Sequence, residues 1–136
     1  MNWKDCLAEG NAVKITPNKK RADFLVKRAE STLKVLGNIK LDETNAPIFF
    51  TNYYDALLEI LHAMMYTDGY KVKNHYCLGY YLQDILQDRE SFSVFDRSRL
   101  LRNSIIYYGE LFDKAVLLDA IRQIKETFAV LRRKIR

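Results

Sequence analysis

The chain has 136 residues, a length that suits one domain, and 49% of them are hydrophobic, as in folded proteins. Its five glycines and two prolines suit long helices and argue against a β-sandwich or barrel, which needs many tight turns. The net charge of +5 permits, but does not establish, binding to a phosphate-bearing partner. The start of the chain carries Lys4 and Asp5 without a signal-length apolar run, and no run of apolar residues is long enough to span a membrane. We therefore predict a cytoplasmic protein without membrane contact.

The two cysteines, Cys6 and Cys77, lie far apart in the sequence. No Cys-x-x-Cys or Cys/His pair has the spacing of a zinc site, and no metal or other cofactor is expected. In a reducing cytoplasm, the two residues are predicted to be buried or half-buried thiols.

Helical spacing of apolar residues recurs through most of the chain, between breaks rich in glycine, proline and asparagine. The first sixteen residues are expected to form a short leading helix and a cap. Residues 68–72 are expected to form a connection, and strand signals are weak, since Ile48-Phe49-Phe50 is too short to build a sheet. Helices are predicted at about 18–36, from 51 or 52 to 66, at 74–87, through the segment 97–112, and from about 112 to the C-terminus. The predicted fold is a single all-α domain over 1–136, an up-and-down bundle of four long helices plus a short extra helix.

The segment 97–112, RSRLLRNSIIYYGELF, combines an apolar stripe with a polar face. At 100° per residue, one stripe faces the core; it consists of Leu101, Ile105, Tyr108 and Phe112. The remaining polar side chains fall on a broad face that points away from this core; they are Arg99, Arg102, Asn103 and Tyr107.

Those four side chains suit a charged, planar ligand such as a nucleotide. Arginine offers a planar fork of donors for phosphate, asparagine a donor and an acceptor, and tyrosine a ring on which a base can stack. A structural alternative is an ordinary amphipathic helix whose arginines pair with acidic side chains such as Asp96 or Glu110, or with a neighbouring helix.

Three stretches, in this order and spacing, carry a family resemblance: PNKKRADFLVKRAESTLKVL, NYYDALLEILHAMMYTDGYKVKNHYCLGYYL and RLLRNSIIYYG. The chain resembles the HEPN family, small helical domains of prokaryotic toxin–antitoxin pairs and RNA-processing systems. The resemblance implies a homodimer in which the late Arg-Asn helices meet. It also implies a candidate partner, the minimal nucleotidyltransferase often encoded beside such proteins, which in some pairs modifies a tyrosine near the motif.

Ribonucleases of this family carry an arginine, often followed by a polar residue, and a histidine separated from the arginine by four to six residues, and they cut RNA without metal. By this resemblance Arg102 matches the arginine and Asn103 the polar residue, but the histidine positions hold Tyr107, Tyr108 and Gly109. Tyrosine, with a pKa of about 10, is a poor base at neutral pH, whereas histidine, at about 6.5, accepts and donates protons there.

Besides the nucleotidyltransferase partnership, for which Tyr107 and Tyr108 are the candidate modified tyrosines by position, two functional hypotheses follow. The first is a dimeric module that binds RNA or a nucleotide through Arg99, Arg102, Asn103 and Tyr107 with little or no catalysis. The alternative is a metal-independent endoribonuclease that uses Arg102 with Tyr107 or His75. The sequence also favours a packing role for both histidines, His62 within an apolar segment and His75 at the start of a helix.

Overall fold

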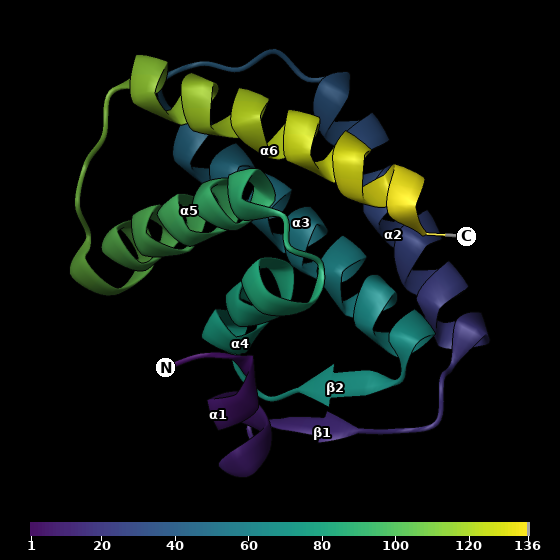
Figure 1. The fold of residues 1–136 in the computed structure, drawn as a ribbon. Helices are drawn as coiled ribbons and strands as arrows, with labels where there is room; N and C mark the ends of the chain where they lie inside the picture. The colour runs from purple at the N-terminus through teal and green to yellow at the C-terminus, as the bar shows by residue number, and fades with distance from the viewer. Residues whose placement is uncertain (136) are drawn as a thin grey trace.

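The computed structural model describes residues 1–135 and confirms a mostly helical protein (Figure 1). The elements are α1 (Trp3–Ala8), β1 (Ala12–Lys14), α2 (Lys19–Gly37), α3 (Ala46–Asp68), β2 (Tyr70–Val72), α4 (His75–Tyr80), the π-helical turn η1 (Tyr81–Ile85), α5 (Arg89–Tyr108) and α6 (Lys114–Lys134). None of the helices within residues 1–135 has the length and apolar character that crossing a membrane requires.

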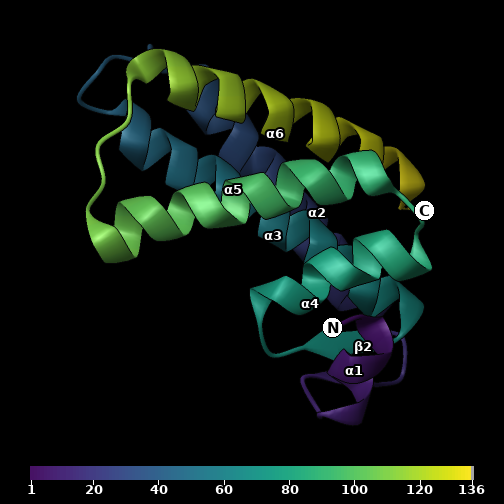
Figure 2. The ribbon, with the colours of Figure 1, turned by 60° about the vertical axis from the view of Figure 1, so that its left-hand side comes forward.

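The long helix α3 forms the centre of the core. Helices α2, α5 and α6 all pack against it, and α5 and α6 lie beside each other across it (Figures 1 and 2). A helix that is apolar on most sides is buried on most sides, and the fully buried side chains of α3 include Phe50, Tyr54, Leu57, Leu61 and Met65. The predicted start at residue 51 or 52 is wrong, because Pro47 lies in the first turn of α3, where its missing N–H costs nothing.

Local capping explains where α2 begins and ends. The Asn18 side chain accepts a hydrogen bond from the backbone N–H of Arg21 at 3.0 Å, and the helix ends at Gly37. The predicted boundaries, 18–36, agree with the structure within one residue at each end. The last helix, predicted from about residue 112, begins at Lys114.

The predicted helix over 74–87 is found over 75–85, but its second half, η1, is π-helical rather than α-helical. Helix α5 begins at Arg89, within a segment whose composition is that of a break between helices. Asp88 caps it, accepting from the N–H and the hydroxyl of Ser91 at 3.0 and 2.7 Å.

A two-stranded antiparallel sheet joins the N-terminus to the end of α3, which corrects the expectation that residues 68–72 form a simple connection. Ala12 pairs with Val72 and Lys14 with Tyr70. Between α3 and β2, Gly69 has φ +88°, and a Cβ there would lie 2.9 Å from the Ile15 carbonyl oxygen. Only glycine meets both constraints without strain.

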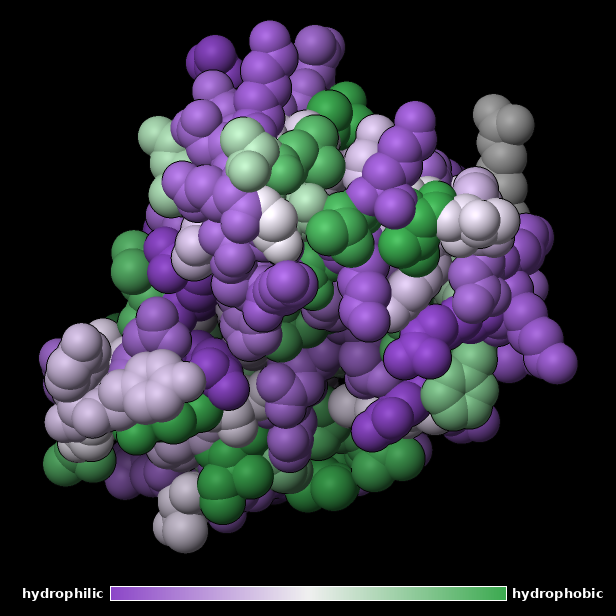
Figure 3. Space-filling view, turned by 90° about the horizontal axis from the view of Figure 1, so that it is seen from below, coloured by the Kyte–Doolittle hydropathy of each residue, from purple (hydrophilic) through white to green (hydrophobic). Residues whose placement is uncertain are grey.

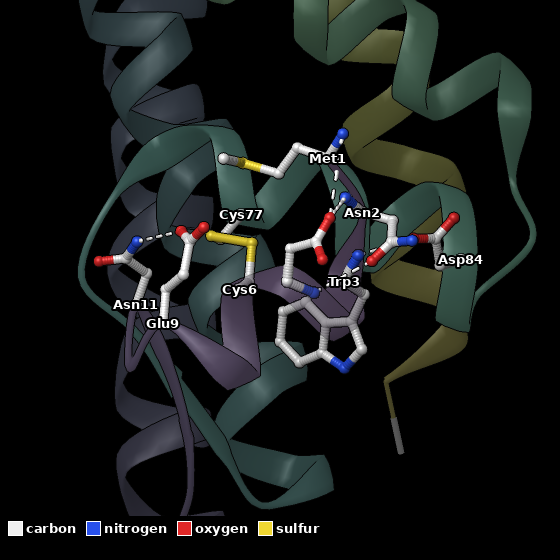
Figure 4. Close-up of polar contacts among 9 residues, drawn as sticks. Met1, Asn2, Trp3, Cys6, Glu9, Asn11, Cys77 and Asp84 are labelled. Carbon is white, nitrogen blue, oxygen red and sulfur yellow. Dashed lines mark hydrogen bonds and ion pairs between the residues drawn. A yellow bond between two sulfur atoms is a disulfide. The ribbon is translucent and has the colours of Figure 1, made fainter.

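A disulfide joins Cys6 of α1 to Cys77 of α4, with the Cα atoms 6.1 Å apart (Figure 4). The prediction that both cysteines are buried or half-buried thiols is therefore wrong. Beside the disulfide, the backbone N–H of Trp3 donates to Asp84 at 2.8 Å, and the Trp3 ring packs edge-on against Tyr70 and Tyr81. These contacts hold the N-terminal cap against β2, α4 and η1.

Candidate functional site

The side of α5 that faces α3 is built from small and aromatic residues. Ser91, Phe95 and Ser98 are buried there, and the same stripe continues one turn later to Arg102. The prediction that Arg102 points away from the core is therefore wrong: its side chain is half-buried against α3. Two of the buried residues in this stripe are serines, which a search for apolar residues at helical spacing does not detect. For this reason, apolar periodicity predicts the wrong side of α5 as the buried side near Arg102.

Arg102 lies between two tyrosines. Its guanidinium carbon is 5.7 Å from the centroid of the Tyr54 ring, on α3, and 6.0 Å from that of Tyr107. Both distances are those of cation–π contacts. The Nε of Arg102 is buried, and no acceptor within residues 1–135 hydrogen-bonds to it. A buried donor without an acceptor is costly, so this atom is unusual in the protein.

His75 meets the same tyrosine. The Tyr54 hydroxyl and His75 Nδ1 lie 3.2 Å apart and share a hydrogen bond whose direction follows the imidazole tautomer. Burial lowers the pKa of His75, Arg102 and Arg99 lower it further, and Asp55 raises it. The imidazole is therefore neutral at pH 7 and able to accept a proton.

Arg99 makes an ion pair with Asp96, as the amphipathic-helix alternative predicts. Its guanidinium donates to Asp96 Oδ1 from Nη2 at 2.9 Å and from Nε at 3.3 Å, one turn back along α5. Asn103, next to Arg102, is partly exposed. The structure thus brings Arg99, Arg102 and Tyr107 to one region, together with His75.

The C-terminal end of α5 is exposed. Tyr107 and Tyr108 are 67% and 75% exposed, so the assignment of Tyr108 to the core is wrong. Leu101, Ile105 and Phe112 are partly buried and pack against the core, as predicted. Tyr108 is one residue before Gly109, where the helix ends with φ +63°, and the chain leaves the core there.

The second histidine, His62, lies further along α3, in a groove between α2, α3 and β2. Burial lowers the pKa of His62 to about 4, with further lowering by His75 and Arg21. The groove has a volume of about 470 Å³, and Asp55, Glu59 and Tyr66 of α3 also line it. His62 is therefore not only a packing residue, because its side chain also lines this groove.

The sequence analysis did not identify Tyr54 and Asp55 as site residues. Tyr54 contacts both Arg102 and His75, and Asp55 is the next residue of α3. Partial burial raises the pKa of Asp55 more than Arg102 and His75 lower it, so this carboxyl is electrostatically coupled to both. Arg102 lies seven residues, or about two helical turns, after Phe95, so both side chains are on one side of the helix. This spacing predicts that Arg102 faces α3 if Phe95 does. Nothing in one helix, however, reveals which tyrosine of another helix it meets.

Within residues 1–135, no three histidine, cysteine, aspartate or glutamate side chains gather where a metal ion would bind. Comparison with known proteins gives no match: no family model, no curated protein and no solved structure is significantly similar to the chain.

Proposed function

We propose that the chain is a HEPN-like four-helix domain that binds RNA or a nucleotide, as a homodimer, through the surface around Arg102. The observation that carries the proposal is the buried Nε of Arg102, which lacks an acceptor while two tyrosine rings hold the guanidinium. A phosphate oxygen is a fitting acceptor for this group, because guanidinium–phosphate hydrogen bonds are charge-assisted and directional.

The remaining groups fit the same ligand. The exposed ring of Tyr107 offers a stacking surface beside the guanidinium, and Asn103 is one residue away on the helix. Arg99 adds positive charge, although its pair with Asp96 reduces what it offers to a phosphate.

The exposed end of α5 supports the dimer. Several large apolar or aromatic side chains are open to solvent there: Leu100, Ile106, Tyr107, Tyr108 and Leu111. Leu111, in the connection to α6, is 96% exposed. In the view of Figure 3, pale and green side chains gather at the left edge, over this end of α5. Apolar clusters of this kind mark contact surfaces.

Binding of labelled single-stranded RNA, measured by fluorescence anisotropy at low salt with a chelator present, tests the proposal. Arg102→Ala should weaken binding roughly tenfold or more, since hydrogen bonds to charged groups contribute about 1.5–3 kcal/mol. Lys40→Ala, an exposed cation in the α2–α3 connection, is the matched control. Equal affinities of the Arg102→Ala variant and the wild type for RNA and for mononucleotides would refute the assignment of this surface.

A second function, metal-independent RNA cleavage, is favoured by one observation: His75 shares Tyr54 with Arg102 and is held neutral. A neutral imidazole can take the proton of a ribose 2′-hydroxyl while the hydroxyl oxygen attacks the adjacent phosphorus. The bond between phosphorus and the 5′-oxygen then breaks, and that oxygen leaves with the proton that the imidazolium returns, while Arg102 stabilises the charge that develops on the phosphate. Tyr107 is the weaker candidate for this role. Cleavage in a chelator that both Arg102→Ala and His75→Gln abolish supports the enzyme; cleavage that survives both substitutions points to a contaminant.

The proposed minimal nucleotidyltransferase partner has its own test. Both Tyr107 and Tyr108 are exposed, so a modifying enzyme has access to either hydroxyl. Intact-mass measurement after co-expression with the neighbouring gene's product should show the added mass of a nucleotide, which the Tyr107→Phe/Tyr108→Phe variant should lack. An unchanged mass argues against this partner.

A further inference from the structure

Phe24, in the second turn of α2, is an exposed aromatic residue surrounded by cations. Its side chain is 63% exposed. The positions three and four residues before and after it share its face of the helix, and all four hold basic residues: Lys20, Arg21, Lys27 and Arg28. A single exposed apolar side chain is ordinary, but four cations around one ring on one helix face form a basic surface with an aromatic centre.

This basic face borders two hollows. One, of about 400 Å³, lies around Phe24 itself and includes Asn18 and Lys20 in its lining. The other is the groove of about 470 Å³ between α2, α3 and β2. Arg21 and Arg28 line both, so the two hollows flank a single basic ridge. Figure 3 shows hydrophilic side chains gathered over the right-hand part of this view, where α2 begins.

The charge in the groove is uneven along its length. Toward Asp55, the Nε of Arg28 lies 3.2 Å from Glu59, so one cation is matched by a carboxylate. Toward β2, Arg21 lies with its guanidinium carbon 5.1 Å from the Tyr66 ring centroid, and the exposed Lys71 also lines the groove. The end of the groove near β2 is therefore the cationic end, and it contains an aromatic ring.

We propose that this ridge and groove bind a single strand of RNA, with a base stacked on Phe24 and phosphates held by Lys20, Arg21 and Lys71. Single-stranded nucleic acid is bound by this combination of aromatic rings and a basic groove, because every base has a π-face and every nucleotide a phosphate. The inference rests on the proposed function, since the strand is a continuation of the RNA at Arg102.

Asp55 connects the two surfaces. It lines the groove and is electrostatically coupled to Arg102 and His75. From Asp55 to Tyr66, the exposed side of α3 runs roughly 16 Å at a rise of about 1.5 Å per residue. One strand passing along α3 therefore reaches both Arg102 and the cationic end of the groove.

A membrane surface is the main competing occupant, because a basic helix with an exposed phenylalanine also suits anionic lipid. The structure favours RNA. The basic residues border two hollows, one with a tyrosine beside its cationic end, whereas a flat lipid surface makes no use of a hollow. In addition, Phe24 is the one large apolar side chain exposed in the first two turns of α2, within the described residues.

The test measures binding of a fluorescein-labelled uridine RNA of about a dozen nucleotides, a length within the site sizes of single-strand binders, over a range of salt concentrations. Phe24→Ala should weaken binding about fivefold or more, and Phe24→Leu should weaken it similarly, because leucine keeps the apolar area but lacks the ring. Arg21→Ala/Lys71→Ala should lower the slope of log K against log salt by about 0.7 for each phosphate that the protein no longer neutralises. All three residues are exposed, so the variants should fold, which circular dichroism checks; Lys40→Ala is the control.

The outcomes separate this inference from the proposed function. If the α2 and β2 variants bind like the wild type while Arg102→Ala loses binding, the groove assignment is wrong and the Arg102 site stands. If the α2 and β2 variants lose binding while Arg102→Ala binds like the wild type, the groove assignment stands and the Arg102 site is wrong. A wild type that binds no RNA overturns both. Binding to phosphatidylserine vesicles that depends on Phe24, without RNA binding, identifies a lipid surface and overturns the inference, as does full recovery of RNA affinity in Phe24→Leu.

Discussion

His62 makes the folded protein sensitive to mild acid. Its pKa is lowered to about 4 in the folded state, mainly by burial, whereas an unfolded histidine has a pKa of about 6.5. Between these values, the unfolded state binds more protons than the folded state. The stability that neutral His62 contributes is therefore fully present above pH 6.5 and is lost as the pH falls toward 4.

The magnitude follows from the two pKa values. Linkage predicts that His62 alone costs about 2 kcal/mol of unfolding free energy between pH 7.5 and pH 5.0, and about 3 kcal/mol at full protonation. Urea unfolding of the wild type and of His62→Gln at both pH values measures this free-energy difference. The unfolding is monitored by circular dichroism and by the fluorescence of Trp3, the single tryptophan. The loss of stability on acidification should be about 2 kcal/mol smaller in His62→Gln than in the wild type.

Both proteins contain the same carboxylates, including Asp55 and Glu59, which line the same groove and whose pKa values are raised by burial. The pKa of Asp88 is lowered by its hydrogen bonds to Ser91 and Lys134, against the effect of burial, so its charge is retained at pH 5.0 and is common to both proteins. His75 shifts in the same direction as His62, and His75→Gln measures its share separately. An equal pH dependence in wild type and His62→Gln would refute the reasoning, because it would mean that the imidazole is solvated in the folded state.

Two further predictions concern the N-terminal part of the fold. Reducing the Cys6–Cys77 disulfide, which spans a sequence separation of 71 residues, should lower the unfolding free energy by about 4 kcal/mol in the chain-entropy model, and equal urea midpoints for the oxidised and reduced proteins would contradict this. Gly69→Ala should cost about 1–3 kcal/mol, because its φ is +88° and a Cβ would lie 2.9 Å from a backbone oxygen. The matched control, Gly37→Ala at the end of α2, meets no atom within 4 Å and should be neutral or slightly stabilising; similar losses in both variants would exclude the steric explanation.

The parts of the fold predicted well are those encoded locally. Helix α2 has its cap at Asn18, its apolar stripe and its stop at Gly37 within one short segment, so its boundaries follow from that segment alone. The start of α3 was missed because Pro47 resembles a break, although proline in the first turn begins a helix as readily as it ends one.

The parts that the sequence did not predict depend on partners far along the chain. Strand β1 has three residues and little β-propensity of its own, and it forms because β2 offers its backbone groups. The disulfide likewise needs α1 to lie beside α4. Within α5, Arg102 faces Tyr54 of α3 and follows the buried Ser91 and Ser98 along the helix, and hydrophobic periodicity does not record buried serines.

The position of the candidate site on α3 has an electrostatic consequence. α3 is otherwise the core of the molecule, yet Asp55, Glu59, His62 and Tyr66 recur along one side of it, which forms the wall of the groove. Since burial and nearby arginines lower the pKa values of His62 and His75, neither histidine carries charge at neutral pH. Anion binding at pH 7 then relies on arginine and lysine, whose charge does not change between about pH 6 and 8. A phosphate near His75 would raise its pKa, and by linkage the affinity for RNA would rise as the pH falls. Burial thus has two effects: buried His62 lowers the stability of the protein in acid, and half-buried His75, neutral in the free protein, should take up a proton when a phosphate binds beside it.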